Sequence, residues 1–164
     1  MMAVSATYKS ELTVTDTISG TPALSTSDNT VTHNALNRNL TLNATSTPDA
    51  ELVAEFRATL SGGAFTIDLT AIPTLLGTVD ASGKKVRAFK FRALSTNSGA
   101  ITVAPGASHA YNMLGTGWSI PVPVDGEVLM YLKDTAPAVV DSSADTLSLS
   151  GTGTDALDVI FLFG

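Results

Sequence analysis

The sequence contains no cysteine, and only two of its 164 residues are histidines. Without cysteine the chain forms neither disulfides nor thiolate metal sites, and its redox compartment stays open. The two histidines, His33 and His109, lie far apart in polar stretches and show no HxH or HExxH spacing. A zinc site is therefore not expected.

Charged residues are also scarce, at 15% of the chain, and the formal net charge is −6. A net-acidic domain is a poor generic binder of nucleic acid. The longest apolar run, near Val159–Phe163, is far too short to span a bilayer. The first residues lack the basic region, apolar core and cleavage site of a signal peptide. We expect a soluble protein, made in the cytoplasm, with no membrane partner.

Motifs for catalysis and cofactor binding are missing too. A Ser–His–Asp arrangement can be drawn around His109, but no Gly-x-Ser-x-Gly elbow supports it. The loop at Gly151–Thr154 is rich in glycine without a Walker lysine. Acidic residues are frequent in the C-terminal third without EF-hand spacing, which favours ordinary solvated turns over a Ca²⁺ site. We expect no enzyme activity, no cofactor and no metal.

Short alternations of apolar and polar residues run through most of the sequence, separated by Gly, Pro, Asn and Asp. This pattern is typical of β-strands joined by turns. The predicted strands cover residues 10–19, 36–42, 52–60, 65–69, 84–94, 101–103, 118–122, 128–132, 147–149 and 157–163. Residues 72–83 are predicted to form a loop, with one helical turn possible at 73–76.

These strands predict an all-β fold, a two-sheet antiparallel sandwich of jelly-roll type over residues 36–164. Residues 1–35 form an extended N-terminal arm that contains too few large apolar side chains to fold alone. Leu12, Val14 and Ile18 nevertheless keep an alternating register. We expect this arm to add as a strand to a neighbouring subunit, the alternative being a frayed terminus.

The segment Lys84–Leu94 holds five of the nine Lys and Arg residues. Its alternation predicts a long strand whose two ends differ in face preference, which indicates a bulge or a change of packing environment. Lys85, Arg87, Lys90 and Arg92 are candidate partner-binding residues. Their cations have three candidate partners: the chain's own carboxylates, another protein, or the phosphates of a nucleic acid, which is the least favoured of the three.

Several short phrases, in a shared order, resemble a family of uncharacterised virion proteins of tailed phages. They are Ser46–Pro48, Gly62–Ile72, Val79-Asp80, Gly83–Val86, Pro105–Ser108, Tyr111, Gly115, Val128–Asp134, Pro137, Gly151–Gly153 and the apolar C-terminal strand. The resemblance covers roughly residues 45–164. The family usually has Asn-Gly before the tyrosine, where this chain has His109-Ala110, so this loop is expected to differ.

The resemblance implies a non-enzymatic structural protein of the virion that decorates or cements the capsid shell. It implies the major capsid protein as partner, a homo-oligomer expected to be a trimer, and no catalytic residues to carry over. The alternative is a tail- or fibre-associated jelly roll that binds a host carbohydrate. In that case Tyr111, Trp118 and Tyr131 are the candidates for stacking on sugar rings.

Overall fold

The computed structural model describes residues 4–18, 29–75, 77–133 and 137–164, and all regular structure in these ranges is β. The strands are β1 (Ser5–Ser10), β2 (Val14–Ile18), β3 (Asn29–His33), β4 (Arg38–Asn43), β5 (Leu52–Thr59), β6 (Ala64–Asp68), β7 (Ile72–Thr74), β8 (Gly77–Val79), β9 (Val86–Ala93), β10 (Ile101–Pro105), β11 (Ile120–Val122), β12 (Glu127–Tyr131), β13 (Thr146–Ser150) and β14 (Ala156–Phe163). The predicted all-β class is confirmed.

The chain divides into two compact units. The smaller comprises Thr7–Thr41, and the larger comprises Leu42–Gly164 together with the residues up to Ala6. The boundary placed at residues 35 and 36 from the sequence falls inside the smaller unit, between β3 and β4.

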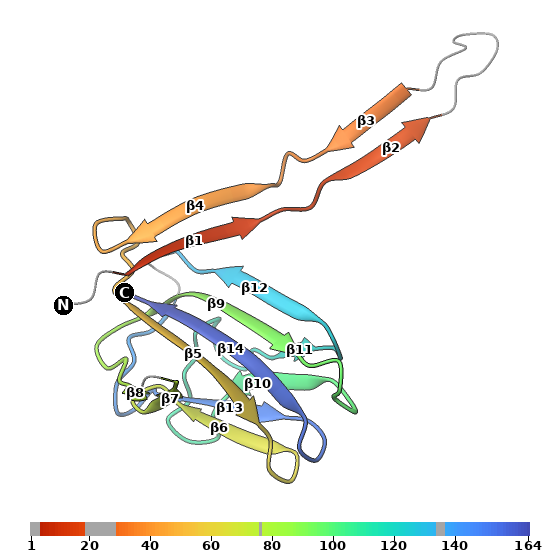
Figure 1. Ribbon diagram of the computed structural model, residues 1–164. Helices are drawn as coiled ribbons and strands as arrows, with labels where there is room; N and C mark the ends of the chain where they lie inside the picture. Colours follow the sequence, from red (N-terminus) through yellow and green to blue (C-terminus); the bar gives the residue numbers. More distant parts are fainter. Residues whose placement is uncertain (1–3, 19–28, 76, 134–136) are drawn as a thin grey trace. The chain divides into compact units, whose positions relative to one another are not determined.

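Two four-stranded antiparallel sheets pack face to face in the larger unit (Figure 1). One sheet has the strand order β12-β9-β14-β5, and the other has the order β11-β10-β13-β6. Successive strands mostly change sheet, since β5, β9, β12 and β14 belong to the first sheet and β6, β10, β11 and β13 to the second. The predicted antiparallel sandwich is therefore confirmed.

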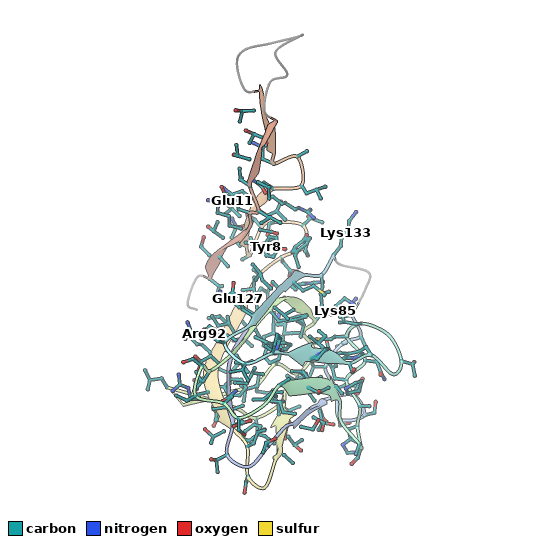
Figure 2. All side chains as sticks on the ribbon, turned by 90° about the vertical axis from the view of Figure 1, so that its right-hand side faces the viewer. Tyr8, Glu11, Lys85, Arg92, Glu127 and Lys133 are labelled. Carbon is teal, nitrogen blue, oxygen red and sulfur yellow. The ribbon has the colours of Figure 1, made fainter. Side chains whose placement is uncertain are left out.

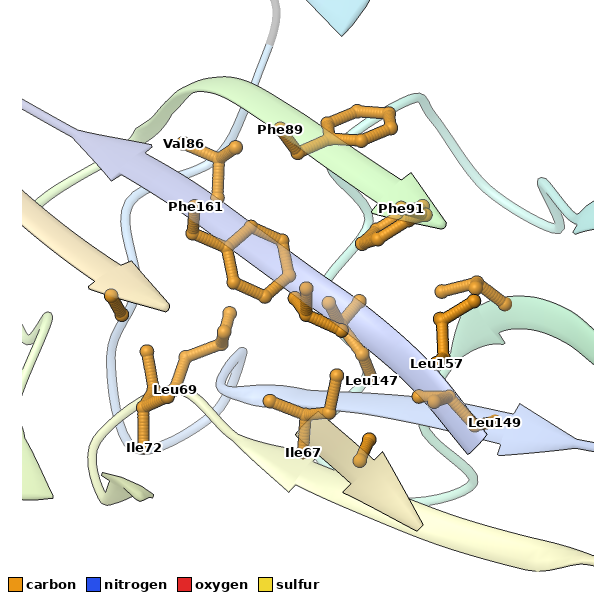
Figure 3. Close-up of a cluster of buried hydrophobic side chains, with 14 of the residues drawn as sticks. Ile67, Leu69, Ile72, Val86, Phe89, Phe91, Leu147, Leu149, Leu157 and Phe161 are labelled. Carbon is orange, nitrogen blue, oxygen red and sulfur yellow. The ribbon is translucent and has the colours of Figure 1, made fainter. Parts of the chain in front are cut away.

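The core lies between the inner faces of these sheets. Phe161 and Leu157 of β14 point toward Leu147 and Leu149 of β13 (Figure 3), and all four side chains are fully buried. Phe161 also meets Phe91 of β9 edge-on, with ring centroids 5.7 Å apart and an interplanar angle of 85°. Aromatic side chains bury large apolar areas, and edge-on pairs add to that gain. The alternation of apolar residues in these strands reflects this one buried face.

A bulge interrupts β9 where its sequence pattern changes face. Leu162 of β14 lies opposite Ala88, but the next residue, Phe163, lies opposite Val86. Arg87 is thus an extra residue on β9, and both Val86 and Arg87 are buried. Of the two explanations offered for the change of face within Lys84–Leu94, the structure shows the bulge, because one inserted residue reverses the facing of everything before it.

One prediction for an irregular segment is wrong. Residues 72–83, expected as a loop, contain the hairpin β7–β8, in which Ile72 lies opposite Val79 and is fully buried. The strand expected over residues 10–19 is present as β2, whereas β1 and β3 were not expected. These strands are short or polar, so they lack the alternation that marks a strand with one buried face.

Candidate interaction surface

Three cross-strand rows of side chains run across the outer face of the β12-β9-β14-β5 sheet. From β12 to β5, the apolar row is Tyr131, Ala88, Leu162 and Val53; the mixed row is Leu129, Lys90, Ile160 and Glu55; and the charged row is Glu127, Arg92, Asp158 and Arg57. The three rows are set by register alone, because residues directly opposite one another on antiparallel strands share a face.

Asp158 is the centre of the charged row. Arg57 donates two hydrogen bonds to its carboxylate, from Nε at 2.7 Å and from Nη2 at 3.1 Å, and Arg92 donates a third at 3.0 Å. The hydrogen bond from Arg57 is the largest cause of a lowered Asp158 pKa, since cations and donors favour the ionised form. The carboxylate therefore joins three strands of the sheet at neutral pH.

The candidate cations of the basic strand occupy different environments. Lys90 and Arg92 reach the outer face, where Lys90 pairs with Glu127 at 2.7 Å and Arg92 pairs with Asp158. Figure 2 shows Arg92 and Glu127 on the same side of the sheet. Arg87 is buried and its Nη2 donates to Asp49 at 2.8 Å.

Lys85 precedes β9, and its backbone exchanges hydrogen bonds of 2.9 Å and 3.1 Å with Gly164. Carboxylates of the chain itself are thus in contact with Arg87, Lys90 and Arg92. Through these ion pairs, the cations of this strand connect it to neighbouring strands and loops of the same chain.

The apolar row is partly covered by residues from near the N-terminus. Ala88 and Leu162 form a buried cluster with Leu42 and Ala50, against which Val4, Ala6 and Tyr131 pack. Beside this cover, apolar side chains remain open: Val53 is 46% exposed, Leu129 38% and Ile160 37%. The outer face therefore presents apolar surface next to a row of charges.

A groove of about 1060 Å³ lies on this face along β5. Its walls are formed by Val53 and residues 55–57 of β5, residues 73–75 of the β7–β8 hairpin, Lys90, Arg92 and residues 158–160 of β14. No pattern in the sequence indicates this groove, because only the packing of the hairpin against the sheet creates it.

The smaller unit is a two-stranded ribbon. β2 pairs with β3, with Val14 opposite His33, and β1 pairs with β4. The side-chain amide of Asn37 accepts a bond from Leu12 N–H at 2.8 Å and donates to Thr13 Oγ1 at 3.0 Å. The ribbon thus replaces the single extended arm expected from the sequence with a segment whose backbone is paired internally.

Three large apolar side chains of the ribbon are exposed. Leu12 is 77% exposed, Val14 47% and Leu36 95%, while the Ile18 side chain lies outside the described residues. A two-stranded hairpin without a packed face is marginally stable in water. Of the three predicted arm residues, Leu12 and Val14 are therefore available as contacts for a partner.

The aromatic candidates for sugar stacking are not gathered on one surface. Tyr111 is fully buried, Tyr131 packs against the apolar row and Trp118 packs against the main core. His109 Nδ1 lies 3.7 Å from Asp145 Oδ1, and no group of three or more metal-binding side chains occurs among the described residues. The side chain of His33 lies outside them.

Within the part of the chain that the structure describes, no helix has the length and apolar character needed to cross a membrane. The chain was also compared with models of known families, with curated proteins and with solved structures, and none of them matches.

Proposed function

We propose that this protein is a non-enzymatic structural component of a tailed-phage particle that decorates or cements the capsid shell. The ribbon is the observation that carries the proposal. It exposes Leu12, Val14 and Leu36 and is attached to a sandwich that has its own complete core. Surface of this kind gains stability when a partner covers it, which is how a cement protein works.

We further propose that the sandwich is of jelly-roll type, and its strand order supports this. Leaving out the β7–β8 hairpin and numbering the remaining strands from β5 to β14 as 1 to 8, the sheets read 6-3-8-1 and 5-4-7-2. A jelly roll also has eight strands in two sheets that exchange strands in this way, and the architecture occurs in viral capsid and lectin domains.

In the proposed mechanism, copies of the protein bind across junctions of the shell, with the major capsid protein as partner. The ribbon lies along an edge or groove of that partner, where backbone hydrogen bonds and the apolar side chains both contribute. A homo-oligomer, proposed as a trimer, presents several ribbons at once. Many weak contacts then add through a high effective concentration.

The experiment is a binding assay with phage particles that lack this protein. The full chain should bind saturably and raise the temperature at which the particles release DNA. A variant in which a short Gly-Ser linker replaces residues 7–41 keeps Ala6 and Leu42 in their buried cluster, so its sandwich should fold but bind poorly. The control is the wild-type chain bound to the same particles.

Two results would overturn the proposal. One is the absence of the protein from purified particles when these are analysed by mass spectrometry. The other is saturable binding to a glycan array combined with no binding to particles, which would favour the carbohydrate-binding alternative.

A further inference from the structure

β5 is an edge strand of its sheet, and among the described residues no strand pairs with its outer side. Leu60 N–H donates to the carbonyl of Asp155 at 2.9 Å, and Thr59 lies opposite Ala156 in the register of β5 and β14. Because backbone groups alternate in direction along an antiparallel strand, Ala58 and Phe56 bond to β14. The groups of Thr59, Arg57, Glu55 and Val53 therefore point away from it.

The sequence of this edge is complementary to itself about Phe56. A second β5 running antiparallel, with Phe56 opposite Phe56, places Glu55 of each copy opposite Arg57 of the other. The same register sets Val53 opposite Thr59 and Ala54 opposite Ala58. Opposite charges, aromatic pairs and β-branched pairs are the combinations that stabilise neighbouring strands. The alignment also joins the outward-pointing backbone groups to one another.

Side chains along the β5 edge can form further contacts with a second copy of the strand. Glu55 forms no ion pair with any residue that the structure describes, although Arg57 on the same face is held by Asp158. Phe56 packs on the rim of the core and is only partly buried. Residues 73–75 of the hairpin line the same groove as β5, and the side chain of Leu75 is 98% exposed.

We propose that two copies of this protein associate through their β5 strands, about a two-fold axis at Phe56. The two β12-β9-β14-β5 sheets then form one continuous sheet across the dimer. A two-fold interface requires a surface that matches itself, and the charge order of β5 meets that requirement. This contact is separate from those of the proposed trimer and does not depend on the proposed virion role, because it involves only surfaces of this chain.

Since the chain contains no cysteine, one introduced thiol reports on the contact directly. Phe56→Cys places the two thiols of a dimer on the axis, where the separation suits a disulfide. The matched control is Val53→Cys, which lies on the same strand and is exposed. Its two copies in the dimer are separated by about 20 Å, at about 3.4 Å per residue over six residues.

Mild oxidation of the full-length protein should give a disulfide-linked dimer with Phe56→Cys and none with Val53→Cys. Val53→Cys combined with Thr59→Cys should also crosslink, and this variant keeps Phe56. Equal crosslinking of Phe56→Cys and Val53→Cys overturns the proposal, because random collision then explains both. A failure of both Phe56→Cys and the double variant to crosslink overturns it as well.

Sedimentation of the cysteine-free protein supplies a second test. Glu55→Arg should raise the dissociation constant of the dimer roughly tenfold, because two attractive cross-strand pairs become repulsive. Glu127→Arg makes the same change of charge on the opposite edge strand, β12, and should leave that constant unchanged. Equal effects of the two variants, or a protein that stays monomeric at all concentrations, would contradict pairing through β5.

Discussion

The side-chain amide of Asn97 exchanges two hydrogen bonds with the backbone of Ala156, donating to its carbonyl and accepting from its N–H, both at 2.8 Å. The neighbouring Asp155 carboxylate accepts bonds from Ser98 N–H at 2.8 Å and Gly99 N–H at 3.1 Å. Together they fasten the turn after β9 to the start of β14. The backbone hydrogen bond from Ser98 is the largest cause of the lowered pKa of Asp155.

Replacing Asn97 by Ala should lower the free energy of unfolding by about 1–3 kcal/mol, because the Ala156 N–H loses its buried acceptor and the Ala156 carbonyl keeps only the 3.4 Å bond from Leu94 N–H. Urea denaturation at pH 7 measures the change. Asn112→Ala is the matched control, since that amide donates a single bond of 3.2 Å to nearby Ala110, and it should cost clearly less. An equal decrease in unfolding free energy for the two variants would show that the Asn97 hydrogen bonds stabilise the fold no more than the single bond of Asn112.

Asp158→Asn should lower the free energy of unfolding at pH 7 by about 1 kcal/mol, the upper range for partly exposed ion pairs. The folded state lowers the pKa of Asp158. Its stabilising contribution is therefore present above the unfolded pKa of about 3.9 and is lost as pH falls through the folded value.

The difference between wild type and Asp158→Asn should accordingly shrink as the pH falls from 5 to 2. Urea titrations at several pH values give this comparison. Asp125→Asn, which changes an exposed carboxyl in a turn, is the control. A difference that stays constant with pH would mean that the ionised carboxylate is not the source of the stability.

Tyr111→Phe should cost about 1–3 kcal/mol, because the hydroxyl donates to Ala138 O at 2.8 Å and accepts from Val86 N–H at 3.2 Å within the core. Burial is the largest cause of the raised Tyr111 pKa. Its contribution to stability is fully present below the unfolded pKa of about 10 and is lost as pH rises toward the folded value.

A titration to alkaline pH, monitored by the absorbance of ionised tyrosine, tests this prediction. One tyrosine should ionise only together with unfolding in the wild-type protein, and that step should be absent from Tyr111→Phe. A variant as stable as wild type would show that the two hydrogen bonds contribute nothing net.

The triple change of Leu12, Val14 and Leu36 to Ser should leave the stability of the sandwich within about 0.5 kcal/mol, since exposed side chains outside a core contribute little. It should weaken particle binding, because it removes exposed apolar surface from the ribbon. Val124 and Val139 are each 40% exposed on the larger unit, and changing them to Ser is the control. If the ribbon variant and the Val124 and Val139 variant weaken particle binding equally, the ribbon is not the surface that contacts the particle.

Most sandwich strands could be predicted from alternation alone. β5, β6, β9 and β13 each have one face in the core, so apolar residues recur at every second position. The change of face at Arg87 was also visible, although the sequence left open whether a bulge or a change of packing environment causes it.

Other strands show no alternation of apolar and polar residues from which they could be predicted. β7 and β8 have three residues each and include a proline and a glycine, so no period is measurable in them. The polar β3 is a strand because it pairs with β2, with Val31 opposite Asp16. A strand held mainly by its backbone partner leaves little trace in its own side chains.

The sequence by itself determined the all-β class, the strand with clustered cations and the small number of large apolar side chains near the N-terminus, since these depend on composition and local period. Only the tertiary structure decided which carboxylates neutralise those cations. Arg92 and Asp158 are 66 residues apart in sequence, yet the register of β9 with β14 sets them opposite one another. Strand order and register result from packing the whole core, so no local pattern contains them.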